Sequence, residues 1–217
     1  MNENTNQNKS SLVKFSMEFV KEFATFLHQN EALKFGDFTL SSGKSSSYYV
    51  DLRLVSSFPH PFRKMIKSLQ DLISKDIGFD NFDCFASVPT GGLVIASALA
   101  METVKPLIYV RTKPKEHGTS KSIEGKIKKG MKVLMIDDVA TTGGSMINSI
   151  QLLKEAGTVV TDAYVILNRL EGADKNLESE GVKMHHLTDI LEMTKSLQES
   201  NLIGKDVLEK IQNQVNK

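Results

Sequence analysis

The chain contains a single cysteine, no long apolar run and almost no net charge, and each of these absences excludes a class of protein. Cys84 has no second thiol with which to form an intramolecular disulfide, which is typical of a reducing compartment and predicts a cytoplasmic location. No stretch of about 18 apolar residues occurs, so the sequence predicts no membrane-spanning helix. A formal net charge of +1 gives no support for binding to nucleic acid or to an acidic membrane surface.

The sequence also lacks an internal repeat and a linker that would divide it. Its 217 residues, of which 40% are hydrophobic and 24% charged, suit one globular domain with a substantial core. Residues 1–11 are rich in Asn, Ser and Lys and carry no apolar run, so we expect a disordered tail and neither a signal peptide nor a transmembrane span. The expected domain therefore covers residues 12–217.

Strand-like and helix-like segments alternate along the chain, which predicts an α/β fold. Short apolar runs predict strands at residues 38–40, 48–52, 82–88, 107–110, 133–136 and 162–167, and a further short strand beside His185 and His186. Apolar residues at helical spacing predict helices at residues 12–27, 61–73, 95–101, 146–153, 190–197 and 207–215. The histidine pair has no other ligand at metal spacing, so we predict no zinc site there.

Residues 131–149 carry the clearest functional signal. The apolar run at residues 133–136 predicts a buried parallel strand, and we expect the adjacent carboxylates Asp137 and Asp138 to end it. A turn of small, hydroxylated and glycine residues then leads into a helix, whose first N–H groups lack intrahelical partners and can bind an anion. Two carboxylates beside a phosphate are repulsive unless they bind vicinal hydroxyls or a divalent cation next to it. A sugar phosphate with a free cis-diol meets both requirements.

A second strand, glycine turn and helix start occur around residues 89–92, Pro-Thr-Gly-Gly. By itself this turn is either a second phosphate-binding turn or a plain helix start. Two such turns in one α/β domain fit a substrate with a phosphate group at each end. Residues 43–45, Gly-Lys-Ser, do not complete a Walker A loop, because Phe38 stands where the first glycine is required and a strand follows instead of a helix.

Two basic features follow predicted strands. Residues 111–130 are either a lid that closes over a polyanion or a solvated basic loop. They leave the sheet at the edge where ligands bind in open α/β folds, which favours the lid. Arg169, after the strand at 162–167, is either a carboxylate-binding group or a surface side chain. The cations of the expected lid are Arg111, Lys113, Lys115, His117 and Lys121.

Nearly all of residues 33–190 resemble the orotate phosphoribosyltransferases, a branch of the type I phosphoribosyltransferases. The resemblance rests on four segments that occur in the family's order: FTLSSGKSSSYYVDLR, YVRTKPKEHGTSKSIEG, VLMIDDVATTGGS and LNRLEG. It implies the type I phosphoribosyltransferase fold, an α/β fold with a central, mostly parallel sheet flanked by helices. A small N-terminal hood would cover about residues 12–60, the core about 61–190, and C-terminal helices residues 190–217.

The resemblance implies transfer of the 5-phosphoribosyl group from 5-phosphoribosyl 1-diphosphate (PRPP) to N1 of orotate, giving orotidine 5′-monophosphate and pyrophosphate in pyrimidine biosynthesis. It also implies Mg²⁺ as cofactor, bound mainly through PRPP without a strong protein ligand. A homodimer is expected in which the loop at 111–125 reaches the neighbouring subunit's site. The alternatives are a phosphoribosyltransferase for a purine or another base, or a non-catalytic PRPP-sensing regulator, which would need a nucleic-acid-binding module that this sequence does not show.

The resemblance also assigns site residues. The catalytic residues would be Arg111, Lys115, His117, Asp137 and Asp138. PRPP would contact these five and Thr90, Gly91, Val139, Ala140, Thr141, Thr142, Gly143, Gly144 and Ser145. Orotate would contact Thr141, Arg169 and the backbone near Tyr49 and Val50. Two positions depart from the family pattern, since many members have lysine in place of Ser41 and of Thr112, and each change removes a cation from a polyanion site.

Overall fold

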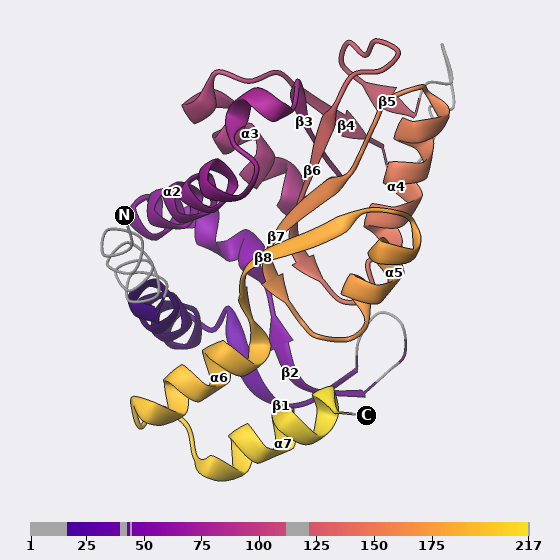
Figure 1. The fold of residues 1–217 in the computed structure, drawn as a ribbon. Helices are drawn as coiled ribbons and strands as arrows, with labels where there is room; N and C mark the ends of the chain where they lie inside the picture. Colours follow the sequence, from indigo (N-terminus) through magenta and orange to yellow (C-terminus); the bar gives the residue numbers. More distant parts are fainter. Residues whose placement is uncertain (1–16, 40–42, 44, 112–121, 217) are drawn as a thin grey trace, which may run out of the picture. The chain divides into compact units, whose positions relative to one another are not determined.

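A computed structural model describes residues 17–39, 43, 45–111 and 122–216 of the chain (Figure 1). The described residues form two compact units. The hood unit consists of the residues up to Val55 together with residues 190–216, and the sheet unit consists of residues 56–189. Over the described ranges, no helix is both long and apolar enough to cross a membrane.

The hood unit joins a two-stranded antiparallel sheet to helices from both ends of the chain. Its first helix covers residues 17–29 and buries Phe19, Phe23 and Leu27, which recur at the spacing of one helix face. The later elements are β1 (Leu33–Thr39), β2 (Ser45–Val50), the start of a 3-10 helix η1 (Leu52–Ser57), α6 (Ile190–Glu199) and α7 (Lys205–Val215).

The sheet unit contains a six-stranded sheet in the order β5-β4-β3-β6-β7-β8, in which the short edge strand β5 is antiparallel and the other strands are parallel. The strands are β3 (Cys84–Ser87), β4 (Leu107–Val110), β5 (Ile123–Glu124), β6 (Val133–Ala140), β7 (Asp162–Asn168) and β8 (Lys183–Asp189). The helices are α2 (Pro59–Asp76), the 3-10 helix η2 (Phe79–Asn81), α3 (Gly91–Thr103), α4 (Gly144–Glu155) and α5 (Ala173–Ser179).

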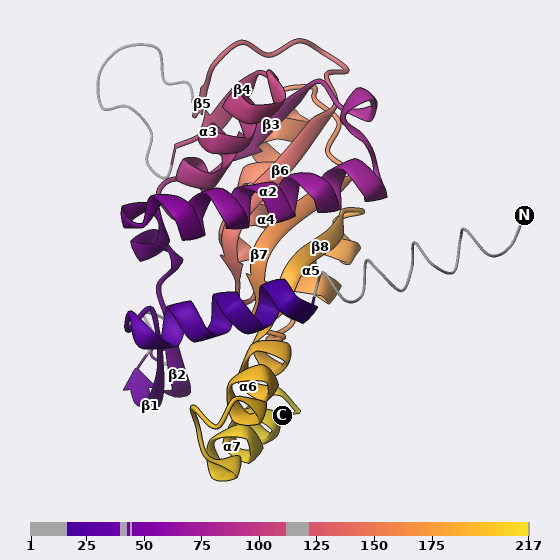
Figure 2. The ribbon, with the colours of Figure 1, turned by 90° about the vertical axis from the view of Figure 1, so that its left-hand side faces the viewer.

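Helices cover both faces of the sheet, with α2 and α3 on one face and α4 and α5 on the other (Figure 1, Figure 2). The central strands are therefore buried on both sides, which explains why they appear in the sequence as unbroken apolar runs. Cys84 on β3 is fully buried, and burial together with the neighbouring Asp83 charge raises the pKa of its thiol to about 12. The thiol is thus a packing group, as its apolar neighbours suggest.

The chain changes direction across the sheet between β3 and β6. From β3 it continues through α3 to β4 on one side, and from β6 through α4 to β7 on the other. The carboxyl end of β3 lies beside the middle of β6, because Ser87 pairs with Ile136 in parallel register, and Asp137 follows directly after this pair. Ligands of open α/β sheets bind at such a switch point, outside the carboxyl ends of the strands. Both predicted anion-binding turns begin there.

Several predicted elements are confirmed within two residues at each end. These are the strands predicted at 82–88, 107–110 and 162–167, now β3, β4 and β7, and the helices predicted at 146–153, 190–197 and 207–215, now α4, α6 and α7. Their signals are local, since each rests on a short apolar run or on an amphipathic stripe.

Two boundary predictions are wrong for tertiary reasons. Asp137 and Asp138 do not end the central strand, because β7 continues to pair with β6 as far as Ala140. The hairpin strands predicted at 38–40 and 48–52 are displaced, because antiparallel pairing sets them at Leu33–Thr39 and Ser45–Val50. In both cases backbone hydrogen bonds to a partner strand outweigh the local residue preference.

Candidate functional site

The acidic pair lies in the carboxyl-terminal half of β6, against the first turn of α3. The backbone N–H of Asp138 donates to Asp137 Oδ1 at 2.9 Å. A Cβ placed on Gly92 would lie 2.5 Å from Asp137 Oδ1 and 2.9 Å from Asp137 Cα, and one on Gly91 would overlap the Asp138 carboxylate. Glycine is therefore required at both positions if the acidic pair is to keep its place. The structure thus brings the turn after β3 together with the predicted carboxylates.

Ser87 lies beneath this contact. Its buried hydroxyl donates to Ile136 O at 2.8 Å and links the end of β3 to β6 just before Asp137. A Cβ on Gly92 would also approach Ser87 Oγ to 2.7 Å, so the hydroxyl, the glycine and Asp137 pack on one another. Neither Ser87 nor Gly92 is among the predicted site residues. Gly92 was visible as the second glycine of the turn, whereas nothing local marks Ser87, because its contacts depend on the pairing of β3 with β6.

Burial sets the electrostatic character of the acidic pair. The pKa of the Asp137 carboxyl is raised well above its ordinary value, mainly by burial and then by the Asp138 charge. The N-terminus of α3, where the helix dipole favours negative charge, lies against both side chains. Ionising both carboxylates is therefore costly until a hydrogen-bond donor or a cation binds them, which is the property expected of a site for vicinal hydroxyls.

The turn after β6 begins α4 and leaves its first backbone N–H groups available to an anion. Gly143 has φ 77°, a left-handed conformation that glycine adopts without steric cost. Asn176 Nδ2 donates to Thr142 O at 2.9 Å and ties the turn to α5. Thr142, Gly144 and Ser145 are exposed residues of this turn and helix start. Asn176 was not predicted, because it supports the turn from a separate helix.

Three further residues predicted to contact PRPP lie in or beside regular elements. Val139 and Ala140 belong to β6 and not to the turn, so the turn itself begins at Thr141. Thr90, at the start of α3, is exposed, and the peptide bond between Pro89 and Thr90 is cis.

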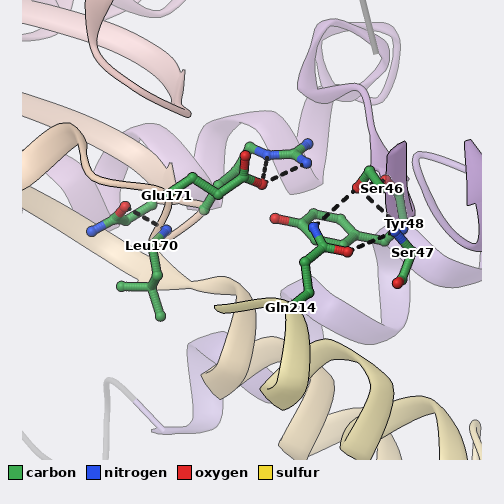
Figure 3. Close-up of polar contacts among 8 residues, drawn as sticks. Ser46, Ser47, Tyr48, Leu170, Glu171 and Gln214 are labelled. Carbon is green, nitrogen blue, oxygen red and sulfur yellow. Dashed lines mark hydrogen bonds and ion pairs between the residues drawn. The ribbon is translucent and has the colours of Figure 1, made fainter. Parts of the chain in front are cut away.

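Arg169 lies directly after β7 and is 4% exposed, so the alternative of a surface side chain is wrong. Its backbone N–H donates to Ala140 O at 2.9 Å, which extends the pairing of β7 with β6. Its Nε and Nη2 atoms lie 3.0 and 2.9 Å from Glu171 Oε1 (Figure 3). A buried guanidinium held in one orientation is suited to binding a planar carboxylate.

Of the remaining predicted residues, the structure describes Arg111, Tyr49 and Val50. Arg111 follows β4, and its Nη1 lies 3.1 Å from Glu124 Oε1 on β5. Tyr49 and Val50 belong to the hood unit, where Tyr49 is 38% exposed on β2. The other predicted lid cations and the two positions of departure lie outside the described residues: Lys113, Lys115, His117, Lys121, Ser41 and Thr112.

The acidic pair is also the place where Mg²⁺ could be held. Within the described ranges, no group of three or more His, Cys, Asp or Glu side chains could enclose a metal ion. Asp137 and Asp138 supply carboxylate oxygens, which Mg²⁺ prefers, and Mg²⁺ usually takes its other ligands from water and substrate phosphates. The donor set therefore fits an ion that is carried by a phosphorylated substrate.

Comparison with known proteins agrees with this geometry. Residues 60–194 match the phosphoribosyl transferase domain family. The orotate phosphoribosyltransferase of Cenarchaeum symbiosum is 52% identical over 196 residues, which are 90% of this chain and 98% of that protein. The crystal structure of orotate phosphoribosyltransferase from Aeropyrum pernix has a TM-score of 0.72 at 35% identity, over 83% of this chain and 99% of that chain.

The orotate phosphoribosyltransferase of Mycobacterium tuberculosis, crystallised in complex with PRPP, shares the fold at 23% identity, with a TM-score of 0.63 over 81% of this chain and 99% of that chain. The sheet with its switch point, the acidic pair between two glycine turns and the extensive identity to curated relatives lead to one assignment. The chain belongs to the orotate phosphoribosyltransferase family of type I phosphoribosyltransferases.

Proposed function

We propose that this orotate phosphoribosyltransferase transfers the 5-phosphoribosyl group of PRPP to N1 of orotate through the residues clustered at the carboxyl ends of β3, β6 and β7. The products are orotidine 5′-monophosphate and pyrophosphate, a step of pyrimidine biosynthesis. The observation that supports the proposal is the packing of the Asp137 and Asp138 carboxylates against Gly91 and Gly92, because two adjacent carboxylates beside a glycine turn suit a diol next to a phosphate.

The acidic pair binds the ribose. Asp137 and Asp138 accept hydrogen bonds from the 2′- and 3′-hydroxyls, which relieves the cost of keeping two carboxylates together. The 5′-phosphate binds the turn from Thr141 to Ser145, where it meets the hydroxyl groups and the first N–H groups of α4. The pyrophosphate binds the turn that contains Thr90 and Gly91.

The reaction breaks the bond between the anomeric carbon and the pyrophosphate oxygen while N1 of orotate attacks that carbon, and the departing pyrophosphate takes up the proton that N1 releases. Positive charge develops on the ribose, and the acidic pair stabilises it. Negative charge develops on the leaving pyrophosphate, and Arg111, Lys115 and His117 neutralise it. Closure of the loop over the site excludes water, which would otherwise compete with orotate. Mg²⁺ bound to PRPP would supply further charge neutralisation at the pyrophosphate.

Orotate is recognised through its carboxylate and its ring. Arg169, which Glu171 holds by two N–H···O contacts, binds the carboxylate with its planar guanidinium. Thr141 and the backbone near Tyr49 and Val50 contact the ring. This placement supports orotate over purine bases, because purines carry no carboxylate for the arginine.

The direct test follows the loss of orotate absorbance after PRPP and Mg²⁺ are added to the purified protein. We expect orotate to be consumed, and adenine and hypoxanthine to be left unchanged in parallel reactions. A preference for a purine base would refute the assignment of Arg169, and PRPP binding without consumption of any base would favour the non-catalytic regulator.

We also propose that the enzyme is a cytoplasmic homodimer in which the loop at 111–125 reaches the partner subunit's site. Lys115→Ala and Asp138→Asn variants should each be inactive. When the two are mixed and allowed to exchange subunits, hybrid dimers would contain one intact site, and activity should return to about a quarter of the wild-type level. If the loop serves its own subunit, every site in the mixture lacks one group and no activity returns.

A further inference from the structure

The hairpin of the hood unit contains a β-bulge beside the strand that we propose lines orotate. Phe35 pairs with Tyr48 and Phe38 pairs with Ser46, so two residues of β1 lie opposite Ser47 alone. A bulge of this kind interrupts the hydrogen-bond ladder and bends the strand. The β1–β2 ladder therefore does not by itself fix the conformation of β2 just before Tyr49.

Helix α7 supplies the hydrogen bonds that the ladder lacks at this point. The backbone N–H of Ser47 donates to Gln214 Oε1 at 2.7 Å, and Gln214 Nε2 donates to Ser46 Oγ at 3.3 Å (Figure 3). Ser46 Oγ donates in turn to Tyr48 O at 2.8 Å, and both Ser46 and Tyr48 are buried. One amide side chain thus connects three successive residues of β2 to a helix that is 167 residues away in the sequence.

A second contact of α7 reaches the other strand of the bulge. Lys210 Nζ lies 2.6 Å from Asp37 Oδ1, and Asp37 is one of the two residues of β1 that lie opposite Ser47. Lys210 and Gln214 are four residues apart and therefore lie on the same face of α7. The ion pair is exposed to solvent and contributes little, so the half-buried contacts of Gln214 carry the attachment.

We propose that Gln214 is a positioning residue for orotate, which holds strand β2 in the conformation that presents Tyr49 and Val50 to the base. The inference rests on the proposed placement of orotate beside these two residues. It extends that placement to the C-terminal helix, to which the proposed mechanism assigns no reacting group.

The test compares Gln214→Met, which keeps the length of the side chain and removes both polar contacts, with Gln212→Met, a matched change at an exposed position of the same helix. We expect Gln214→Met to raise the KM for orotate about tenfold, the equivalent of about 1.4 kcal/mol, with kcat and the KM for PRPP unchanged. Hydrogen exchange at the Ser47 amide should become faster. Gln212→Met should change none of these quantities.

A third variant, Gln214→Glu, keeps an oxygen acceptor for the Ser47 N–H and should lie closer to the wild type than Gln214→Met. If exchange at Ser47 becomes faster while the KM for orotate stays the same, or if orotate and PRPP are affected equally, the positioning role is wrong. Unchanged exchange at Ser47 would overturn the attachment itself. A wild-type protein that does not consume orotate would contradict the proposed function instead, so the two failures are distinguishable.

Discussion

The packing of Gly92 on the acidic pair predicts that one added methyl group will disable the site. In Gly92→Ala, the new Cβ would lie 2.5 Å from Asp137 Oδ1, about 0.9 Å closer than the ordinary contact limit of 3.4 Å. The same methyl group would lie 2.9 Å from Asp137 Cα, which is backbone and cannot rotate away. The end of β6 must therefore move.

The displacement of β6 allows the loss of folding stability and the loss of catalytic rate to be estimated. Overpacking of a close-packed region costs about 1–3 kcal/mol of folding stability, which urea denaturation would measure as a lower midpoint. Misplacing a catalytic group by about 1 Å lowers the rate roughly a hundredfold. We therefore expect kcat/KM for PRPP to fall by about two orders of magnitude in the orotate assay.

Two further glycine variants separate the effect on activity from the effect on stability. In Gly91→Ala the atoms nearest to the methyl group belong to the side-chain carboxylate of Asp138, which can rotate, so activity should fall with a smaller loss of stability. Gly144→Ala is the control for stability, because its Cβ would have no neighbour closer than 3.8 Å. If Gly92→Ala keeps both wild-type activity and the wild-type urea midpoint, the contact with Asp137 does not hold the site.

Three other predictions follow from buried groups. Burial raises the pKa of Asp137, so the folded state binds the carboxyl proton more tightly than the unfolded state, and the free energy of unfolding falls as pH rises above about 3.8. Asp137→Asn should therefore raise Tm at pH 7 while activity is lost. A Tm difference between variant and wild type that does not shrink toward pH 4 would contradict this. Cys84, with a pKa of about 12, should react with a thiol reagent at pH 8 only after unfolding, and rapid labelling of the native protein would show that it is accessible. The two ring nitrogens of His185 lie 3.1 Å from an Asp76 carboxylate oxygen and 2.8 Å from an Asp162 carboxylate oxygen. His185→Phe removes both contacts and should lower the free energy of unfolding by about 1–3 kcal/mol without changing kcat. An altered kcat would place the histidine in the reaction.

Part of the site was predictable because its signals are local. The apolar run of β6, the adjacent carboxylates and the turn before α4 lie within a few residues of one another, and their chemistry already indicates a phosphorylated sugar. Likewise β4, β7, α4 and α7 follow from periodicity over single elements. The nature of the ligand could therefore be inferred before any fold was known.

The rest depends on contacts between distant segments. The extent of β6 is set by its ladder with β7, and the need for glycine at residue 92 arises because the β3–β6 register places the first turn of α3 against Asp137. Arg169 could be read as surface or site until its burial was known. The contact of Gln214 with Ser47 spans 167 residues. The sequence by itself determined which chemical groups are available, since residue type and local spacing decide these. Only the tertiary structure decided which groups meet, since strand pairing and helix packing bring together segments that are far apart in the chain.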